Sequence, residues 1–150
     1  MSADLKLESI SAVVPYPLQV NLKSVVEFTK AHYVSGQIAT RQGELISYGL
    51  VGREVNLEIA QECARQCAIN VLSVLRTHIG SLDKVKQVCR VAVYVASDDN
   101  FTDQHLVAHG ASQVFTEVFG DDIGRHARTA IGVKTLPLNS PVEVDTIFEL

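Results

Sequence analysis

Hydrophobic periodicity predicts two amphipathic helices. Between residues 56 and 79, apolar residues recur at helical spacing, and Gly80 is placed to end the helix. These positions are Ile59, Cys63, Cys67, Val71, Leu75 and Ile79. A second helix is predicted over residues 105–119, ending at Gly120 before a pair of aspartates.

Alternating segments predict strands on either side of these helices. Residues 85–96 form a predicted central strand with one nearly apolar face. That face comprises Val85, Cys89, Val91, Val93 and Val95. Residues 25–36 hold two short strand-like runs, broken at Lys30 and Ala31, and a weak strand over 44–48 follows a turn at Gln42 and Gly43.

The C-terminal segments 127–135 and 142–149 both alternate, which predicts an antiparallel hairpin. One register brings four charged residues onto a single face, although a slip of one residue would undo this grouping. They are Arg128, Lys134, Glu143 and Asp145. In that register Arg128 opposes Glu149 and lies roughly 20 Å from Glu143 along the strands. A single chain would therefore hold Arg128 and Glu143 apart.

This order of strands, helix, strand, helix and two strands predicts an α+β fold with both helices on one face of the sheet. Two helices cannot cover both faces of a sheet that is apolar on each side. We therefore expect the uncovered face to be buried in a homo-oligomer.

Length and composition indicate one globular domain over residues 1–150, with 47% hydrophobic and 20% charged residues. The net charge of −4 and the absence of a basic run make nucleic acid an unfavourable main partner. The sequence contains no apolar stretch of about 18 residues and no signal-peptide pattern, so a cytoplasmic location is expected.

Arg128 is the leading candidate for binding a small anion. Its planar guanidinium suits a carboxylate held by two hydrogen bonds, and the small neighbours Ala130 and Gly132 leave space for a small acid. The alternative is an ordinary ion pair on a solvated strand face. Arg125 and His126 could extend an anion site or belong to a solvent-facing turn.

No metal site is predicted. Cys63 and Cys67 lie one helical turn apart without two further soft ligands nearby. His105 and His109 have the spacing of two ligands on one helix face, with Asp103 just before them. Because no third ligand is fixed by the sequence, a solvated or interfacial helix face is the favoured interpretation.

Four segments in order resemble successive signatures of the YjgF/Rid family: SGQIAT (35–40), residues 64–85, VAVYVASDDNF (91–101) and residues 127–147. The ARTAIGV, LP and VEV runs of the last segment are the most diagnostic. The resemblance implies a chorismate-mutase-like α+β fold and a trimer whose sheets form a central barrel with helices outside. It also implies ligand clefts between subunits.

The resemblance further implies hydrolysis of reactive enamines and imines from amino acids, giving 2-oxo acids and ammonia without a metal or organic cofactor. Arg128 matches the family arginine that clamps the substrate carboxylate, and Glu143 matches the glutamate that positions or activates water. Ser35 and Gly36 match a cleft-lining segment, and Tyr16 is matched to a family tyrosine. An imine is already electrophilic, so a carboxylate anchor and a proton acceptor suffice for this chemistry.

Two departures from the family pattern suggest a divergent, longer branch. Ala130 stands where imine deaminases often carry cysteine, which the resemblance implies is tolerable because the family uses the main chain there, and His109 stands where many relatives have asparagine. Both positions are candidate substrate-binding residues. Extra residues lie around 23–31 and 121–126. A non-catalytic, carboxylate-binding or regulatory trimer is therefore the alternative, and an endoribonuclease or translation inhibitor is the weaker one because the chain is acidic.

Overall fold

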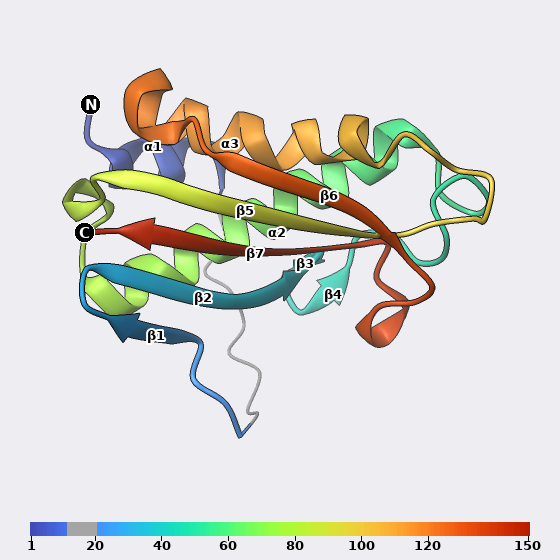
Figure 1. Cartoon of the computed structure of the whole chain (residues 1–150), viewed down its shortest axis with the longest axis horizontal. Helices are drawn as coiled ribbons and strands as arrows, with labels where there is room; N and C mark the ends of the chain where they lie inside the picture. Colours follow the sequence, from blue (N-terminus) through green and yellow to red (C-terminus); the bar gives the residue numbers. More distant parts are fainter. Residues whose placement is uncertain (12–20) are drawn as a thin grey trace.

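Five strands form one mixed sheet in a computed structural model, which describes residues 1–11 and 21–150 (Figure 1). The order across the sheet is β1 (Val25–Phe28), β2 (Ala31–Ile38), β7 (Val142–Glu149), β5 (Gln87–Ala96) and β6 (Ala127–Val133). Strands β5 and β6 are parallel, and all other neighbours are antiparallel. Two short strands follow β2 in the chain and pair with each other in a separate sheet: β3 (Thr40–Arg41) and β4 (Glu44–Leu45). The predicted α+β class is confirmed.

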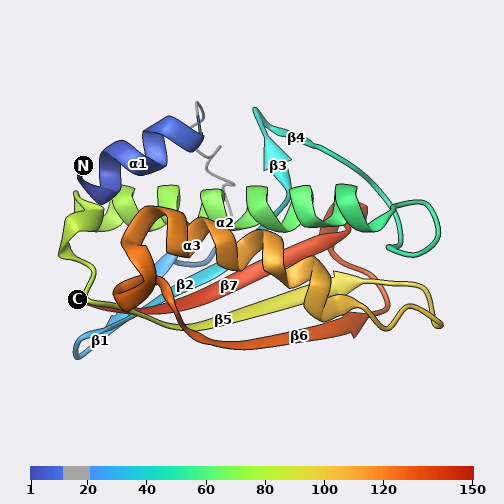
Figure 2. The same cartoon turned by 90° about the horizontal axis from the view of Figure 1, so that it is seen from above.

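Three helices lie on one side of this sheet, two of them against its strands and the third packed on those two, as the view in Figure 2 shows. They are α1 (Ala3–Ile10), α2 (Leu57–Ile79) and α3 (Gln104–Gly124). Helices α2 and α3 are the two predicted ones and lie on one face of the sheet as predicted, whereas α1 was not expected. Ser2 caps α1 by accepting a hydrogen bond from the Leu5 amide, and Leu7 is buried beneath it. Short 3₁₀ turns lie at Leu82–Lys84 and Pro137–Asn139.

The ends of the two long helices follow from capping chemistry. Asn56 caps the start of α2, and Gly80, with a φ of 87°, ends it as predicted. In α3 the backbone leaves helical geometry at Gly120, where φ is 78° and ψ is 173°. The predicted break at Gly120 is therefore present, but a further turn extends the element to Gly124. No described helix combines the length and apolar character needed to cross a bilayer.

The predicted C-terminal hairpin is wrong, because β5 lies between β6 and β7. Arg128 pairs with Val91 of β5 rather than with Glu149, and Glu149 pairs with residues of β2 and β5. Helix α3 connects β5 to β6, and such a crossover allows those strands to be parallel neighbours. The segment after β6 then passes the end of β5 before β7 begins.

A β-bulge in β5 changes which residues face the helices. The register with β7 shifts between Val88 and Arg90. Val88 is fully buried while Cys89 is only half-buried, whereas simple alternation placed Cys89 on the apolar face. Beyond the bulge, Val91, Val93 and Val95 face the core as predicted.

Helices α2 and α3 approach each other closely at Gly110. A side-chain Cβ at this position would overlap the carbonyl oxygen of Gln61 and lie 2.9 Å from its carbonyl carbon. The side chain of Gln61 also donates a 2.9 Å hydrogen bond to the Leu106 carbonyl. Only glycine allows this backbone contact, so Gly110 fixes the separation of the two helices.

Candidate functional site

Arg128 faces the helix layer from the edge strand β6. Its row partner in the sheet is Val91, which in turn pairs with Thr146, and both are fully buried beneath the helices. The guanidinium donates a 3.1 Å hydrogen bond from Nη1 to Ser112 Oγ. A longer contact of 3.5 Å joins Nη2 to the His105 carbonyl oxygen. Arg128 thus rests against α3 while its side chain stays exposed.

The guanidinium has no acidic partner in the part of the chain that the structure describes, where no carboxylate oxygen lies within 4.0 Å of it. Neighbouring arginines differ in this respect. Arg125 pairs with Asp121 at 2.8 Å, and Arg65 pairs with Glu117 at 2.8 Å. An ordinary intrachain ion pair therefore does not account for Arg128, and its charge is available to an anion.

Two side chains fill the space next to Gly132, on the same face of β6 as Arg128. A Cβ at Gly132 would lie 2.8 Å from Ser97 Oγ and 2.9 Å from Gln104 Nε2, so these side chains occupy that space. Ala130 pairs with the buried Val93 and packs against the core. The space predicted beside Arg128 itself stays a prediction.

Glu143 lies on the opposite face of the sheet, together with Gly36 and Ser35. Its neighbours Val142 and Val144 are fully buried towards the helices, so alternation directs Glu143 to the face that bears no described helix. A Cβ at Gly36 would overlap the Glu143 carboxylate. The Ser35 hydroxyl donates a 2.8 Å hydrogen bond to the Lys23 carbonyl at a bulge in β2. The structure therefore brings Glu143, Gly36 and Ser35 into one neighbourhood.

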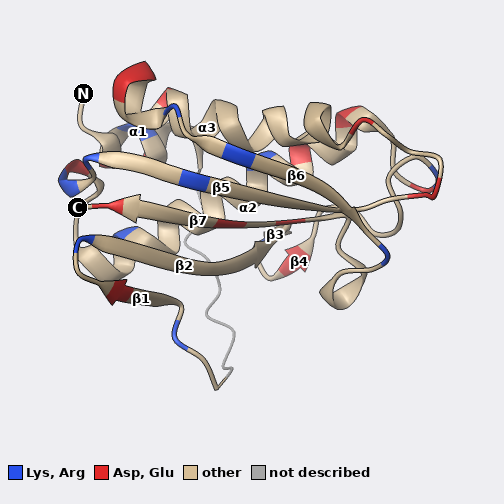
Figure 3. Cartoon of the chain, viewed as in Figure 1, with Lys and Arg blue, Asp and Glu red and all other residues tan. Residues whose placement is uncertain are grey.

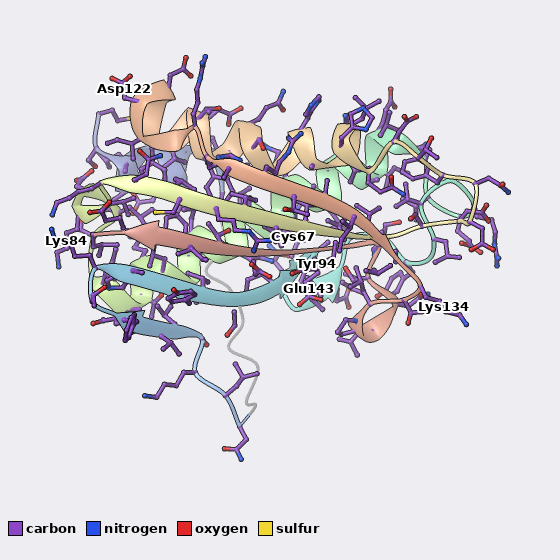
Figure 4. All side chains as sticks on the ribbon, viewed as in Figure 1. Cys67, Lys84, Tyr94, Asp122, Lys134 and Glu143 are labelled. Atoms are coloured by element: carbon purple, nitrogen blue, oxygen red, sulfur yellow. The ribbon has the colours of Figure 1, made fainter. Side chains whose placement is uncertain are left out.

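Tyr94 and Asp145 lie near Glu143 on this open face, and Figure 4 shows the labelled Tyr94 and Glu143 close together. Tyr94 pairs with Glu143 across β5 and β7 and donates a 3.0 Å hydrogen bond to Asp145. Burial and then the charge of Asp145 raise the pKa of Glu143 above its usual range. A carboxylate with a raised pKa is a stronger base, which suits it to accept a proton from water.

Sequence reasoning missed Tyr94 as a site residue. Burial, followed by its hydrogen bond to Asp145, raises the pKa of Tyr94. The signal was its place on the polar face of a central strand, but only the pairing of β5 with β7 brings it next to the carboxylates.

Within one chain, Arg128 and Glu143 lie on opposite faces of the sheet. Figure 3 shows the basic position on β6 and the acidic positions along β7, with β5 between them. The expected separation of these residues therefore holds, although the reason is the face that each occupies and not distance along a hairpin. A site using both would need a second copy of the chain.

His109 lies on the α3 face that also carries Ser112, three residues later. Its ring lies 6.5 Å from that of His105, whose carbonyl accepts from Arg128. His109 is exposed and therefore borders the Arg128 region. Tyr16, the remaining predicted site residue, lies outside the described residues.

Among the described residues, no group of three His, Cys, Asp or Glu side chains could hold a metal ion. Burial raises the pKa of the Cys63 thiol to about 12, and burial also raises the pKa of the Cys67 thiol well above its usual range. Both thiols are thus poor ligands and poor nucleophiles near neutral pH.

A pocket of about 510 Å³ lies elsewhere, between the end of α1, β3 and α2. Its walls include Ile10, Arg41, Glu62 and Gln66. Arg41 is already engaged there, at 3.1 Å by Glu62 and at 3.0 Å by Gln66. None of the predicted site residues that the structure describes lines this pocket, and its arginine is compensated, so it is a weaker candidate for anion binding.

The raised pKa of Glu143 gives a testable effect on stability. From its ordinary value of 4.5 up to the higher folded value, the folded protein binds more protons at Glu143 than the unfolded chain does. The contribution of Glu143 to the free energy of unfolding should therefore fall as pH rises through that window. Glu143→Gln should lack this contribution, so urea denaturation between pH 4 and pH 8 should give a more positive pH slope for the variant than for the unmodified protein. Identical pH slopes for the two proteins would contradict the prediction.

Comparisons with known proteins agree with this architecture. A family model described as "YjgF/chorismate_mutase-like, putative endoribonuclease" matches residues 3–150. Protein TCP17 of Trypanosoma cruzi is 42% identical over 118 residues, covering 79% of this chain and 74% of that protein. The crystal structure of protein Atu1372 from Agrobacterium tumefaciens has a TM-score of 0.90 and 36% identity, covering 99% of this chain and 91% of that one. The E. coli TdcF structure with bound serine shares the fold, with a TM-score of 0.64 and 19% identity over 91% of this chain and 93% of that one.

Proposed function

Because the chain belongs to the YjgF/chorismate mutase-like family, we propose that it hydrolyses small 2-imino acids and their enamine tautomers to 2-oxo acids and ammonia. The observation that carries this proposal is Arg128, an exposed guanidinium that α3 holds in place and that has no acidic partner among the described residues. Such a group suits a small carboxylate.

The proposed reaction uses two residues in distinct roles. Arg128 holds the carboxylate of the imino acid, and Glu143 accepts a proton from water as the water oxygen bonds to the imine carbon. Return of this proton to nitrogen gives a carbinolamine. Its hydroxyl proton then also passes to nitrogen as the carbon–nitrogen bond breaks, releasing ammonia and leaving the 2-oxo acid. The raised pKa of Glu143 favours its role as the base.

We also propose that the site forms between copies in a homotrimer. The sheet face opposite the described helices carries Glu143, and it leaves Tyr33 and Ile131 each 44% exposed. Covering this face with another copy would bury these apolar side chains. It would also allow Glu143 of one copy to approach Arg128 on the edge strand β6 of the next.

Light scattering tests the assembly directly. A trimer should have three times the 16.4 kDa chain mass, or about 49 kDa, and Ile131→Asp should shift the protein towards smaller species. A monomeric mass at micromolar concentration would contradict the proposal.

The bound serine in TdcF supports a ligand of amino-acid size for this fold. A 2-imino acid of similar size presents the same carboxylate to Arg128.

The free thiols of Cys63, Cys67 and Cys89 fit a reducing compartment, in line with the cytoplasmic location proposed.

An assay of ammonia release tests the activity. An amino-acid oxidase generates imines from a series of amino acids, and the purified protein should accelerate their conversion to 2-oxo acid and ammonia. If pyruvate binds but no imine reacts faster than in buffer, the non-catalytic carboxylate-binding alternative is correct.

Endoribonuclease activity is the other alternative, because the family model carries that description. The net charge of −4 and the carboxylates along β7 oppose binding of an RNA backbone. The assay uses protein freed of contaminating nucleases. If this protein cleaves RNA and the Glu143→Gln substitution abolishes the cleavage, the proposed imine hydrolysis would be overturned.

A further inference from the structure

Arg128 is the start of a directional hydrogen-bond chain that runs through α3. Its Nη1 donates to Ser112 Oγ at 3.1 Å, and Ser112 Oγ lies 3.0 Å from His126 Nε2. The other ring nitrogen, His126 Nδ1, lies 2.6 Å from the Gly124 carbonyl oxygen. These residues come from β6, the middle of α3 and the turn that joins them.

The chemistry of the last acceptor fixes the direction of this chain. A carbonyl oxygen can only accept, so the hydrogen of a neutral His126 ring belongs on Nδ1. Nε2 is then a bare acceptor and receives the hydroxyl hydrogen of Ser112. Because this hydrogen is committed to His126, a lone pair of Ser112 Oγ is left for the guanidinium of Arg128.

The surroundings of His126 keep this arrangement in place. Its ring packs edge to face on the fully buried Phe115, with centroids 5.5 Å apart. Burial is the main cause that lowers the pKa of His126, and the charge of Arg128 lowers it further, while the Gly124 carbonyl opposes both. The ring is therefore neutral at physiological pH, as the hydrogen-bond direction requires.

We infer that Ser112 is a positioning residue, backed by His126, which aims the guanidinium of Arg128 at the substrate carboxylate. The inference rests on the proposed function. Two of the five guanidinium N–H donors are used, by Ser112 Oγ and the His105 carbonyl, so three remain for a ligand. A long side chain held by two contacts loses less conformational entropy when it binds a ligand than a free one does.

Pyruvate binding measured by calorimetry, together with steady-state kinetics, tests this role. In Ser112→Ala, the Kd for pyruvate and the KM for the imine should rise by about tenfold, while kcat changes by less than about twofold. Ser112→Thr keeps the hydroxyl and should bind within about threefold of the unmodified protein. Thr116→Ala is the matched control, since among the described residues its hydroxyl bonds to carbonyls of its own helix.

An Arg128→Ala background separates positioning from general damage. There, adding Ser112→Ala should cause no further loss of pyruvate binding, because the group that Ser112 positions is gone. A second loss of similar size in that background would overturn the inference. Unchanged pyruvate binding in Ser112→Ala would overturn it as well.

Nuclear magnetic resonance of ligand-free protein distinguishes this inference from the proposed function. Restrained rotation of the Arg128 guanidinium should be visible in the unmodified protein and in Ser112→Thr, and lost in Ser112→Ala. Such a loss in a protein inactive on imines would reject the activity and retain the positioning role. Equal mobility in all three proteins would reject the positioning role, whatever the activity.

Discussion

Substituting Arg128 with alanine is expected to lower kcat/KM for small 2-imino acids by at least about 100-fold. Hydrogen bonds to a charged group contribute about 1.5–3 kcal/mol each, and a carboxylate held by two of them would lose both. Each 1.4 kcal/mol corresponds to a factor of ten, so two bonds account for this loss. Ammonia release from imines generated by an amino-acid oxidase measures the effect.

Two further substitutions show whether the guanidinium itself matters. Arg128→Lys retains the charge but not the planar fork of donors, so it should recover only part of the activity. Arg125→Ala removes the same charge three residues away, from a side chain that is 76% exposed and paired with Asp121. That variant should stay within about twofold of the unmodified protein. Equal losses in Arg125→Ala and Arg128→Ala would show that net charge, and not a specific anchor, sets the rate.

Replacing Phe148 with alanine is expected to lower the free energy of unfolding by about 3–5 kcal/mol. Phe148 is fully buried between the sheet and α3. Its ring lies 6.1 Å from that of Phe115 and 6.5 Å from that of Phe119, both edge to face. Truncation would leave a cavity under α3 and remove these aromatic contacts. Urea or thermal denaturation measures the loss.

Leu5→Ala serves as the control for this substitution. Leu5 is 54% exposed on α1, and alanine is a good helix former, so the change should stay within about 0.5 kcal/mol. A loss below about 1 kcal/mol in Phe148→Ala would show that the core repacks around the missing ring.

The sequence predicted the helices and strands more accurately than it predicted which strands lie side by side. The period of α2 and the glycine at its end were enough to place that helix at residues 57–79. Strand pairing was predicted wrongly because alternation indicates a strand's two faces but not which strand lies beside it. The short helix α1 was missed since its two buried residues, Ala3 and Leu7, give little periodic signal.

The same contrast holds for the candidate site, where the residues sharing a strand face were predicted correctly but the neighbouring elements were not. Alternation correctly grouped Arg128 with Ala130 and Gly132, yet the assumed hairpin placed Arg128 on the face of Glu143. Arg128 in fact faces α3, and only the placement of α3 over β6 brings Ser112 to its guanidinium. This contact joins residues that are 16 positions apart and lie in different elements, so no local pattern in the sequence predicts it. The functional roles of Arg128 and Glu143 stay predictions.

The close approach at Gly110 has a consequence for how this protein tolerates change. Gly110 lies two residues before Ser112, so a methyl group there would push α3 away from α2 and carry the support of the guanidinium with it. Gly110→Ala could thus mimic an anchor defect without touching any ligand. A screen for inactive variants would therefore recover substitutions that disturb the packing of α2 against α3, as well as substitutions of Arg128 itself. The affinity for the ligand would then depend on how these two helices are aligned.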